Sequence, residues 1–235
     1  MTDAKTEILA RIRGALHDAP PVPEVARSYR VSSERPREGV VEMLEDRLLD
    51  YKASVYREST DSLPDRVAEL LGASARYVVP AGLDTAWLPG DTAARRAIVD
   101  PNDARAASAL GVRELNAVDA VVTSSTVSCA ETGTIFLTGR PDEGRRAISL
   151  VPDHHICVVA LDSVVELVPE ALARVSPTAP ITMISGPSAT SDIELERVEG
   201  VHGPRRLDVI LLGPASESTG TGTTYRPGAP GRGVD

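Results

Sequence analysis

The chain has 235 residues, of which 42% are hydrophobic and 25% charged. This length and balance suit a soluble globular protein with one large domain or two small ones. The net charge is −9 and the sequence pI is near 5.0. Because an acidic surface repels phosphate backbones and the basic residues form only short arginine pairs, we expect no nucleic-acid partner.

The two cysteines, Cys129 and Cys157, lie too far apart in sequence for a local metal or iron–sulfur motif. We expect two reduced, buried thiols in a cytoplasmic protein, with a disulfide between neighbouring strands as the alternative. The first 16 residues carry acids and arginines within their apolar pattern, which is not typical of a signal peptide. No run approaches the ~20 apolar residues that span a bilayer. The sequence therefore predicts no membrane span, no metal and no cofactor in this chain.

Residues 1–38 predict an N-terminal helix followed by a proline-rich arm. Thr2 or Asp3 can cap the helix, and Ile8, Leu9, Ile12 and Leu16 mark one apolar face. Residues 19–38 are rich in proline, arginine and serine, which is typical of an extended segment. We expect the helix to pack loosely on the body or on a second subunit, so a homodimer is left open.

Residues 39–213 predict one α/β domain. Amphipathic helices are expected over residues 40–56, 63–71, 103–110 and 162–175. Strands are expected over residues 76–80, 120–123, 134–138, 147–151, 156–161, 181–184 and 207–212. Continuous apolar strands suit a sheet that is covered on both faces, so a three-layer open sheet is expected. Residues 214–235 are rich in Ser, Thr, Gly and Pro, and we interpret them as a flexible tail.

A polar turn, Glu131-Thr132-Gly133-Thr134, lies between two apolar strands and is the first candidate site. Binding and catalytic groups are often found on loops that a rigid scaffold holds. Glu131 can act as a general base, a nucleophile or an acceptor for a ligand hydroxyl, with the two threonines and Gly133 lining the site. The alternative is structural: Glu131 caps the N–H groups of its own turn, supported by Thr132 and Thr134.

A second candidate site is the loop from Gly186 to Ser191, expected between a strand and a short helix that Ser191 caps. Free N–H groups with the hydroxyls of Ser188, Thr190 and Ser191 favour a small carboxylate or phosphate ligand. Acidic residues in the first turn of that helix offset its dipole, so a simple capped turn is the alternative.

Histidines and arginines at turns complete the candidate residues. His202, beside Gly203-Pro204, is the better acid–base candidate, whereas His154 and His155 are expected to point to opposite sides of a strand. Arg140 and Arg205 can each hold a carboxylate through two hydrogen bonds, although solvated surface arginines are the commoner case.

Three segments in this order resemble the LUD-domain family: SCAETGTIFLTG, SLVPDHHICVV and ITMISGPSATSDIELERVEGVHGPRRLDVILL. The resemblance covers residues 119–212 most strongly and extends back to about residue 40. It implies an open α/β sheet similar to the ribose-phosphate isomerase and CoA-transferase group (the NagB/RpiA/CoA transferase-like fold). It also implies a place in a cytosolic system that oxidises L-lactate to pyruvate together with iron–sulfur partner proteins, which would hold the clusters that this chain lacks.

The resemblance does not fix the chemistry of this chain, because function depends on the site rather than the fold. The first hypothesis is a subunit of the lactate-oxidising system that binds a small anion near Glu131 and the Gly186 loop. The second is an independent enzyme of CoA-transferase or sugar-phosphate isomerase type that uses Glu131. The third is a scaffold or regulatory subunit without a catalytic site.

Overall fold

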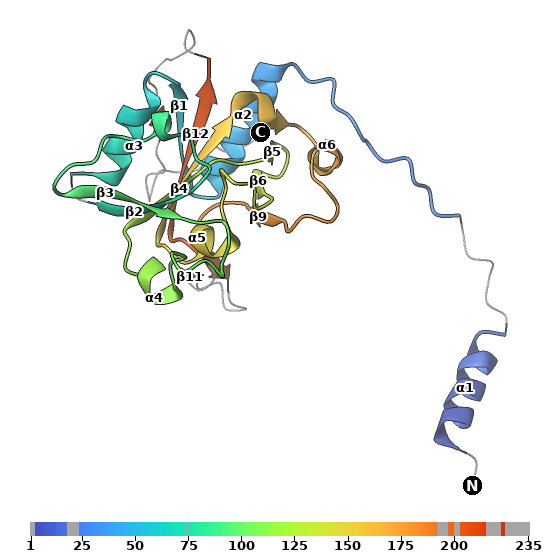
Figure 1. The fold of residues 1–235 in the computed structure, drawn as a ribbon. Coiled ribbons are helices and arrows are strands. Elements are labelled where there is room, and N and C mark those ends of the chain that lie inside the picture. The colour runs from blue at the N-terminus through green and yellow to red at the C-terminus, as the bar shows by residue number, and fades with distance from the viewer. Residues whose placement is uncertain are drawn as a thin grey trace.

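The body of the protein is an α/β domain built on one large, mainly parallel sheet (Figure 1). The computed structural model describes residues 3–17, 24–73, 75–191, 197–199, 203–214 and 222–223. The sheet has the strand order β13-β1-β12-β7-β4-β2-β3, and only β13 pairs antiparallel. Its strands are β1 (Ser54–Ser59), β2 (Ala75–Pro80), β3 (Arg95–Asp100), β4 (Ala120–Thr123), β7 (His154–Ala160), β12 (Arg206–Gly213) and β13 (Gly222–Thr223).

Helices cover both faces of this sheet. Helix α3 (Leu63–Leu71) packs on one face, where Val67 and Tyr77 are fully buried. Pro64 lies in its first turn, and Gly72 ends it with a φ of +75°. The other face carries α2 (Arg37–Asp50), α4 (Val112–Leu115) and α5 (Arg146–Leu150). The predicted three-layer α/β sheet is therefore confirmed.

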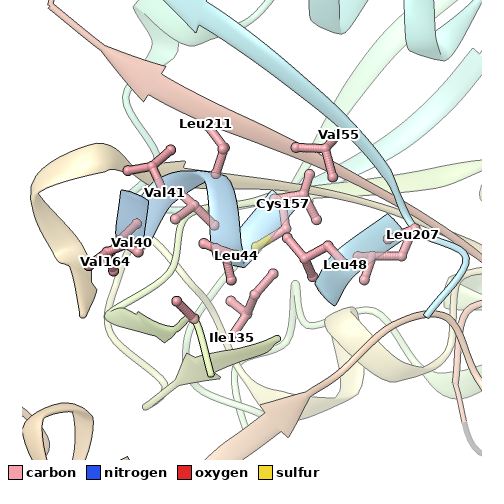
Figure 2. Close-up of a cluster of buried hydrophobic side chains, with 14 of the residues drawn as sticks. Val40, Val41, Leu44, Leu48, Val55, Ile135, Cys157, Val164, Leu207 and Leu211 are labelled. Atoms are coloured by element: carbon pink, nitrogen blue, oxygen red, sulfur yellow. The ribbon is translucent and has the colours of Figure 1, made fainter. Parts of the chain in front are cut away.

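A second, four-stranded sheet lies beyond α2, with the order β8-β5-β6-β9. Its strands are β5 (Val127–Cys129), β6 (Thr134–Leu137), β8 (Val164–Val165) and β9 (Thr182–Ile184). Figure 2 shows Leu44 and Leu48 of α2 between the large sheet and Ile135 of the second sheet. Helix α6 (Val168–Ala173) covers the outer face of this sheet. The remaining elements are the 3-10 turns η1 (Thr85–Trp87) and η2 (Leu161–Ser163) and the hairpin β10 (Ala189–Ser191) with β11 (Arg197–Glu199).

The N-terminal helical extension predicted from the sequence is confirmed. Helix α1 (Ala4–Ala15) is capped by the Asp3 carboxylate, which accepts a hydrogen bond from the Lys5 N–H. No residue of α1 is buried, and its apolar residues Ile8 and Ile12 are 57% and 48% exposed. Figure 1 shows the helix away from the domain.

Several predicted element boundaries are wrong. The helix expected over residues 40–56 ends at Asp50, and the chain turns at Lys52, which has a φ of +68°. Strand β1 then begins at Ser54, because its residues pair with β12 in the large sheet and Val55 is buried there. Residues 147–151 were expected as a strand, but residues 147–150 belong to helix α5 and Val151 follows its end. Ile148 of this helix packs on β2 and β4. Residues 103–110 form turns, and residues 162–175 hold η2, β8 and α6 in place of one helix.

Both cysteine thiols are free and buried, as predicted. Burial raises the pKa of the Cys157 thiol to about 12. That thiol therefore stays protonated and unreactive at neutral pH. No helix within the described ranges is long and apolar enough to cross a membrane.

Candidate functional site

The Glu131 turn connects β5 to β6 and packs on the C-terminal end of α2. Gly133 has a φ of +57°, and a Cβ atom there would lie 2.8 Å from the Cβ of Arg47. Only glycine fits both the backbone conformation and the close approach. The Thr132 and Thr134 hydroxyls lie 2.8 Å apart, which ties the turn together.

The structure brings this turn and the Gly186 loop together. The Thr134 Oγ1 lies 2.8 Å from the Ser185 Oγ, so a hydroxyl–hydroxyl hydrogen bond joins the two segments. Gly186 has a φ of +98°, and a Cβ atom there would lie 2.8 Å from the Tyr51 carbonyl oxygen. Tyr51 also lies against Gly133. Tyr51, at the end of α2, thus contacts two motifs that lie about 50 residues apart in sequence.

A pocket of about 340 Å³ opens beside the Gly186 loop. Its polar lining comes from α5, the start of β7 and the loop itself, and its apolar lining includes Leu150, Ile184 and Leu207. The Ser188 N–H donates a 2.7 Å hydrogen bond to the Pro204 carbonyl oxygen, which closes one wall. The polar side chains that line the pocket are Arg146, Ser149, His155, Thr182, Ser185 and Ser188.

Arg146 supplies the positive charge of this pocket. It is exposed, and within the described residues its guanidinium makes no ion pair with a carboxylate. The neighbouring arginine, Arg145, does have a carboxylate partner, because its guanidinium donates two hydrogen bonds to Asp100. An exposed arginine that lines a pocket and has no carboxylate partner among the described residues favours an anionic ligand.

His155 lines the pocket and is 1% exposed. Its Nε2 atom is 2.8 Å from the Thr123 hydroxyl, and its Nδ1 atom is buried without a hydrogen-bond partner. Burial, together with the neighbouring His154, lowers the pKa of His155 to about 3. The imidazole is therefore neutral at physiological pH, with one ring nitrogen left for a hydrogen bond.

The depressed pKa of His155 predicts a pH dependence of stability. The unfolded imidazole titrates near 6.5, so between pH 6.5 and 3 the unfolded state binds more protons than the folded state. The free energy of unfolding should fall by up to about 1.4 kcal/mol per pH unit as the pH drops below 6.5. Urea unfolding between pH 7 and 4.5 measures this slope. His155→Gln should flatten it and exposed His17→Gln should not; parallel profiles for all three proteins would contradict the assignment.

Glu131 itself does not line this pocket. Its side chain is 46% exposed, and its Oε1 atom accepts a 2.5 Å hydrogen bond from Arg30 of the N-terminal arm. The arm also reaches Glu166, whose carboxylate is bound by the Ser33 hydroxyl and lies 3.4 Å from Arg35. These contacts lower the pKa of Glu166, with the Ser33 hydrogen bond as the largest cause. The carboxylate of Glu131 therefore helps to hold the arm.

The other predicted residues are spread over the neighbouring surface. Arg140 is exposed and pairs with Asp142 at 3.3 Å. Arg205 donates two 2.6 Å hydrogen bonds to Asp153, which lower the pKa of that carboxyl. Thr190 and Ser191 lie on β10, with side chains outside the described part, and His202 and the helix predicted after Ser191 also fall outside it.

The two adjacent histidines lie on opposite faces of β7, as expected for a strand. His154 Nε2 is 2.6 Å from the Asp208 carboxylate, which also accepts a 2.8 Å contact from Arg206. The sequence pattern favours His202 over His155 as a candidate, and it does not single out Arg146 or Ser185, which line the pocket. Within the described ranges no group of His, Cys, Asp and Glu side chains suits a metal ion.

The structure is that of an α/β protein with a pocket lined by α5, the start of β7 and the Gly186 loop. Residues 41–212 match the LUD domain family, and the chain belongs to that family. The chain is similar to the lactate utilization protein C of Deinococcus radiodurans, with 44% identity over 215 residues that cover 90% of this chain and 96% of that protein. The lactate utilization protein C of Bacillus subtilis is 35% identical over 39% of this chain and 41% of its own length.

A solved structure supports the same fold. The crystal structure of a DUF162 family protein from Deinococcus radiodurans matches with a TM-score of 0.63 and 40% identity. The match covers 76% of this chain and 99% of that chain. The likeness to the ribose-phosphate isomerase and CoA-transferase group remains a prediction.

Proposed function

We propose that this chain is a subunit of a cytoplasmic system that oxidises L-lactate to pyruvate. It binds a small organic or phosphate anion in the pocket beside the Gly186 loop and assembles with iron–sulfur partner proteins. Relatives called lactate utilization protein C, one of them 44% identical, support the role in lactate use. The observation that carries the ligand site is Arg146, which lines a pocket beside the Gly186 loop. The Glu131 turn does not line this pocket and is joined to it through the Thr134–Ser185 hydrogen bond.

The cysteine count supports a division of labour between subunits. An iron–sulfur cluster needs about four thiolate ligands, and this chain has two cysteines, both buried in the domain. Electron transfer from lactate would therefore run through partner proteins. In this proposal the present chain contributes a ligand site and a docking surface.

Lactate-dependent dye reduction with the purified iron–sulfur partners tests the proposal. The partners are assayed alone, with the wild-type chain, and with Arg146→Ala, Glu131→Gln or Arg113→Ala, the last being an exposed arginine outside the pocket. We expect the wild type and Arg113→Ala to restore activity, Arg146→Ala to lose at least tenfold, and Glu131→Gln to keep most of it. Because Glu131 pairs with the arm, its replacement should act mainly through that contact.

Other outcomes of this assay would change the role assigned to Glu131 or to the chain. Loss of activity in Glu131→Gln, with folding and assembly intact, would support the catalytic role predicted for Glu131 from the sequence. Equal activity with and without the chain would contradict the lactate assignment. In that case assays with CoA esters and sugar phosphates would test the second hypothesis.

A further inference from the structure

The volume and the apolar lining of the pocket restrict the choice of ligand more than the charge of Arg146 does. A volume of about 340 Å³ falls in the range that holds ligands of drug-like size, well above a three-carbon acid. The apolar side chains Leu150, Ile181, Ile184 and Leu207 form part of the wall. Lactate, a three-carbon acid with one methyl group, would fill only part of this volume. With lactate bound, water would remain in contact with these apolar side chains, and the favourable free energy of burying them would be lost.

We infer that the pocket takes an organic anion with an apolar body larger than that of lactate. The anionic head lies at Arg146 and the hydroxyls of Ser185 and Ser188, and the body covers the aliphatic wall. The inference rests on the proposed function only in taking this pocket as the ligand site. It implies that the chain senses or positions a second compound and leaves lactate to the partner proteins.

His155 gives an independent reason to expect a polar group on that ligand. A buried ring nitrogen without a partner is costly, and native structures rarely leave one unsatisfied. The Nε2 atom is bound to Thr123, so Nδ1 is the buried atom that lacks a partner, on a ring that lines the pocket. A hydroxyl or carbonyl oxygen on the ligand, next to the anionic head, would satisfy it. A 2-hydroxy or 2-oxo acid with an aromatic or aliphatic side chain has all three features.

A matched pair of ligands tests the inference on the full-length chain. L-lactate and L-3-phenyllactate share the same 2-hydroxy acid head and differ by one phenyl ring. Isothermal titration should show phenyllactate binding at least tenfold more tightly, because the ring leaves water for the aliphatic wall. Arg146→Ala should weaken phenyllactate binding at least tenfold, while Arg113→Ala should leave it unchanged.

The histidine contact has its own readout in the wild-type chain. With ¹⁵N-labelled histidine, saturating phenyllactate should shift the Nδ1 resonance of His155 and leave that of His17 in place. Equal or tighter binding of lactate would overturn the inference, as would binding of inorganic phosphate alone or no binding of either acid. An unmoved His155 resonance would overturn the placement of the head. The dye-reduction assay is independent of these titrations, so failure of the lactate role and failure of this inference are distinguishable.

Discussion

Replacing Arg145 by methionine should lower the free energy of unfolding by about 3–5 kcal/mol, because it leaves a buried carboxylate without its counter-charge. Asp100 is 1% exposed, and Arg145 binds it through two hydrogen bonds of 2.6 and 2.7 Å. The same guanidinium donates to the Leu110 carbonyl oxygen, and Asp100 accepts a 2.9 Å hydrogen bond from the Leu110 N–H. The pair thus joins the end of β3 to the start of α5.

Two further variants test this explanation. Arg140→Met removes an exposed pair with Asp142 and should cost at most about 1 kcal/mol. The double variant Asp100→Asn/Arg145→Met removes the uncompensated charge and should be more stable than Arg145→Met alone. Urea denaturation of the four proteins measures the differences. A cost below about 1 kcal/mol for Arg145→Met, or a double variant less stable than the single one, would contradict the account.

Leu44→Ala should destabilise the domain by about 2–5 kcal/mol. Leu44 is fully buried, and Figure 2 shows it between the large sheet and the second sheet, among Val41, Leu48 and Ile135. Truncation would leave a cavity, because the two sheets on either side of Leu44 cannot both move inward to fill it. The same region supports the Glu131 turn, so the site should loosen together with the core.

The matched control is Leu9→Ala in α1. Leu9 belongs to a helix with no buried residue, so its truncation should change the free energy of unfolding by no more than about 0.5 kcal/mol. Thermal and urea unfolding of both variants measure the contrast. A similar loss in both would show that α1 packs on the domain in solution, contrary to the arrangement described here.

Much of the fold could be predicted because local signals agree with the tertiary structure. The apolar runs of β7 and β12 predict buried strands, and Ser62, Pro64 and Gly72 mark both ends of α3. Strand β1 could not be predicted, because its residues continue the helical pattern of α2. Pairing with strands that are distant in sequence, β12 and β13, makes them extended. Strand β3 is at the edge of the sheet and carries two arginines, so its sequence does not show a buried strand.

The candidate site was predicted in part. The motifs around Thr134 and Ser188 were recognised from the sequence, and the Thr134–Ser185 contact joins them in space. Glu131 pairs with Arg30, 101 residues away, and no local pattern could reveal that contact. Arg146 and His155 reach the pocket from a helix and a strand whose packing sets their positions. The sequence does not distinguish Arg145, which pairs with Asp100, from Arg146, which has no carboxylate partner among the described residues.

The most direct test of the central claim compares Arg146→Ala with Glu131→Gln in an equilibrium titration of L-3-phenyllactate. In this proposal the ligand lies in the pocket that Arg146 lines, and Glu131 lies outside that pocket, where it pairs with Arg30 of the arm. It predicts that Arg146→Ala weakens binding at least tenfold, the scale of a hydrogen bond to a charged group, and that Glu131→Gln changes it less than about twofold. The reverse order of effects, or no binding to the wild-type chain, would contradict it.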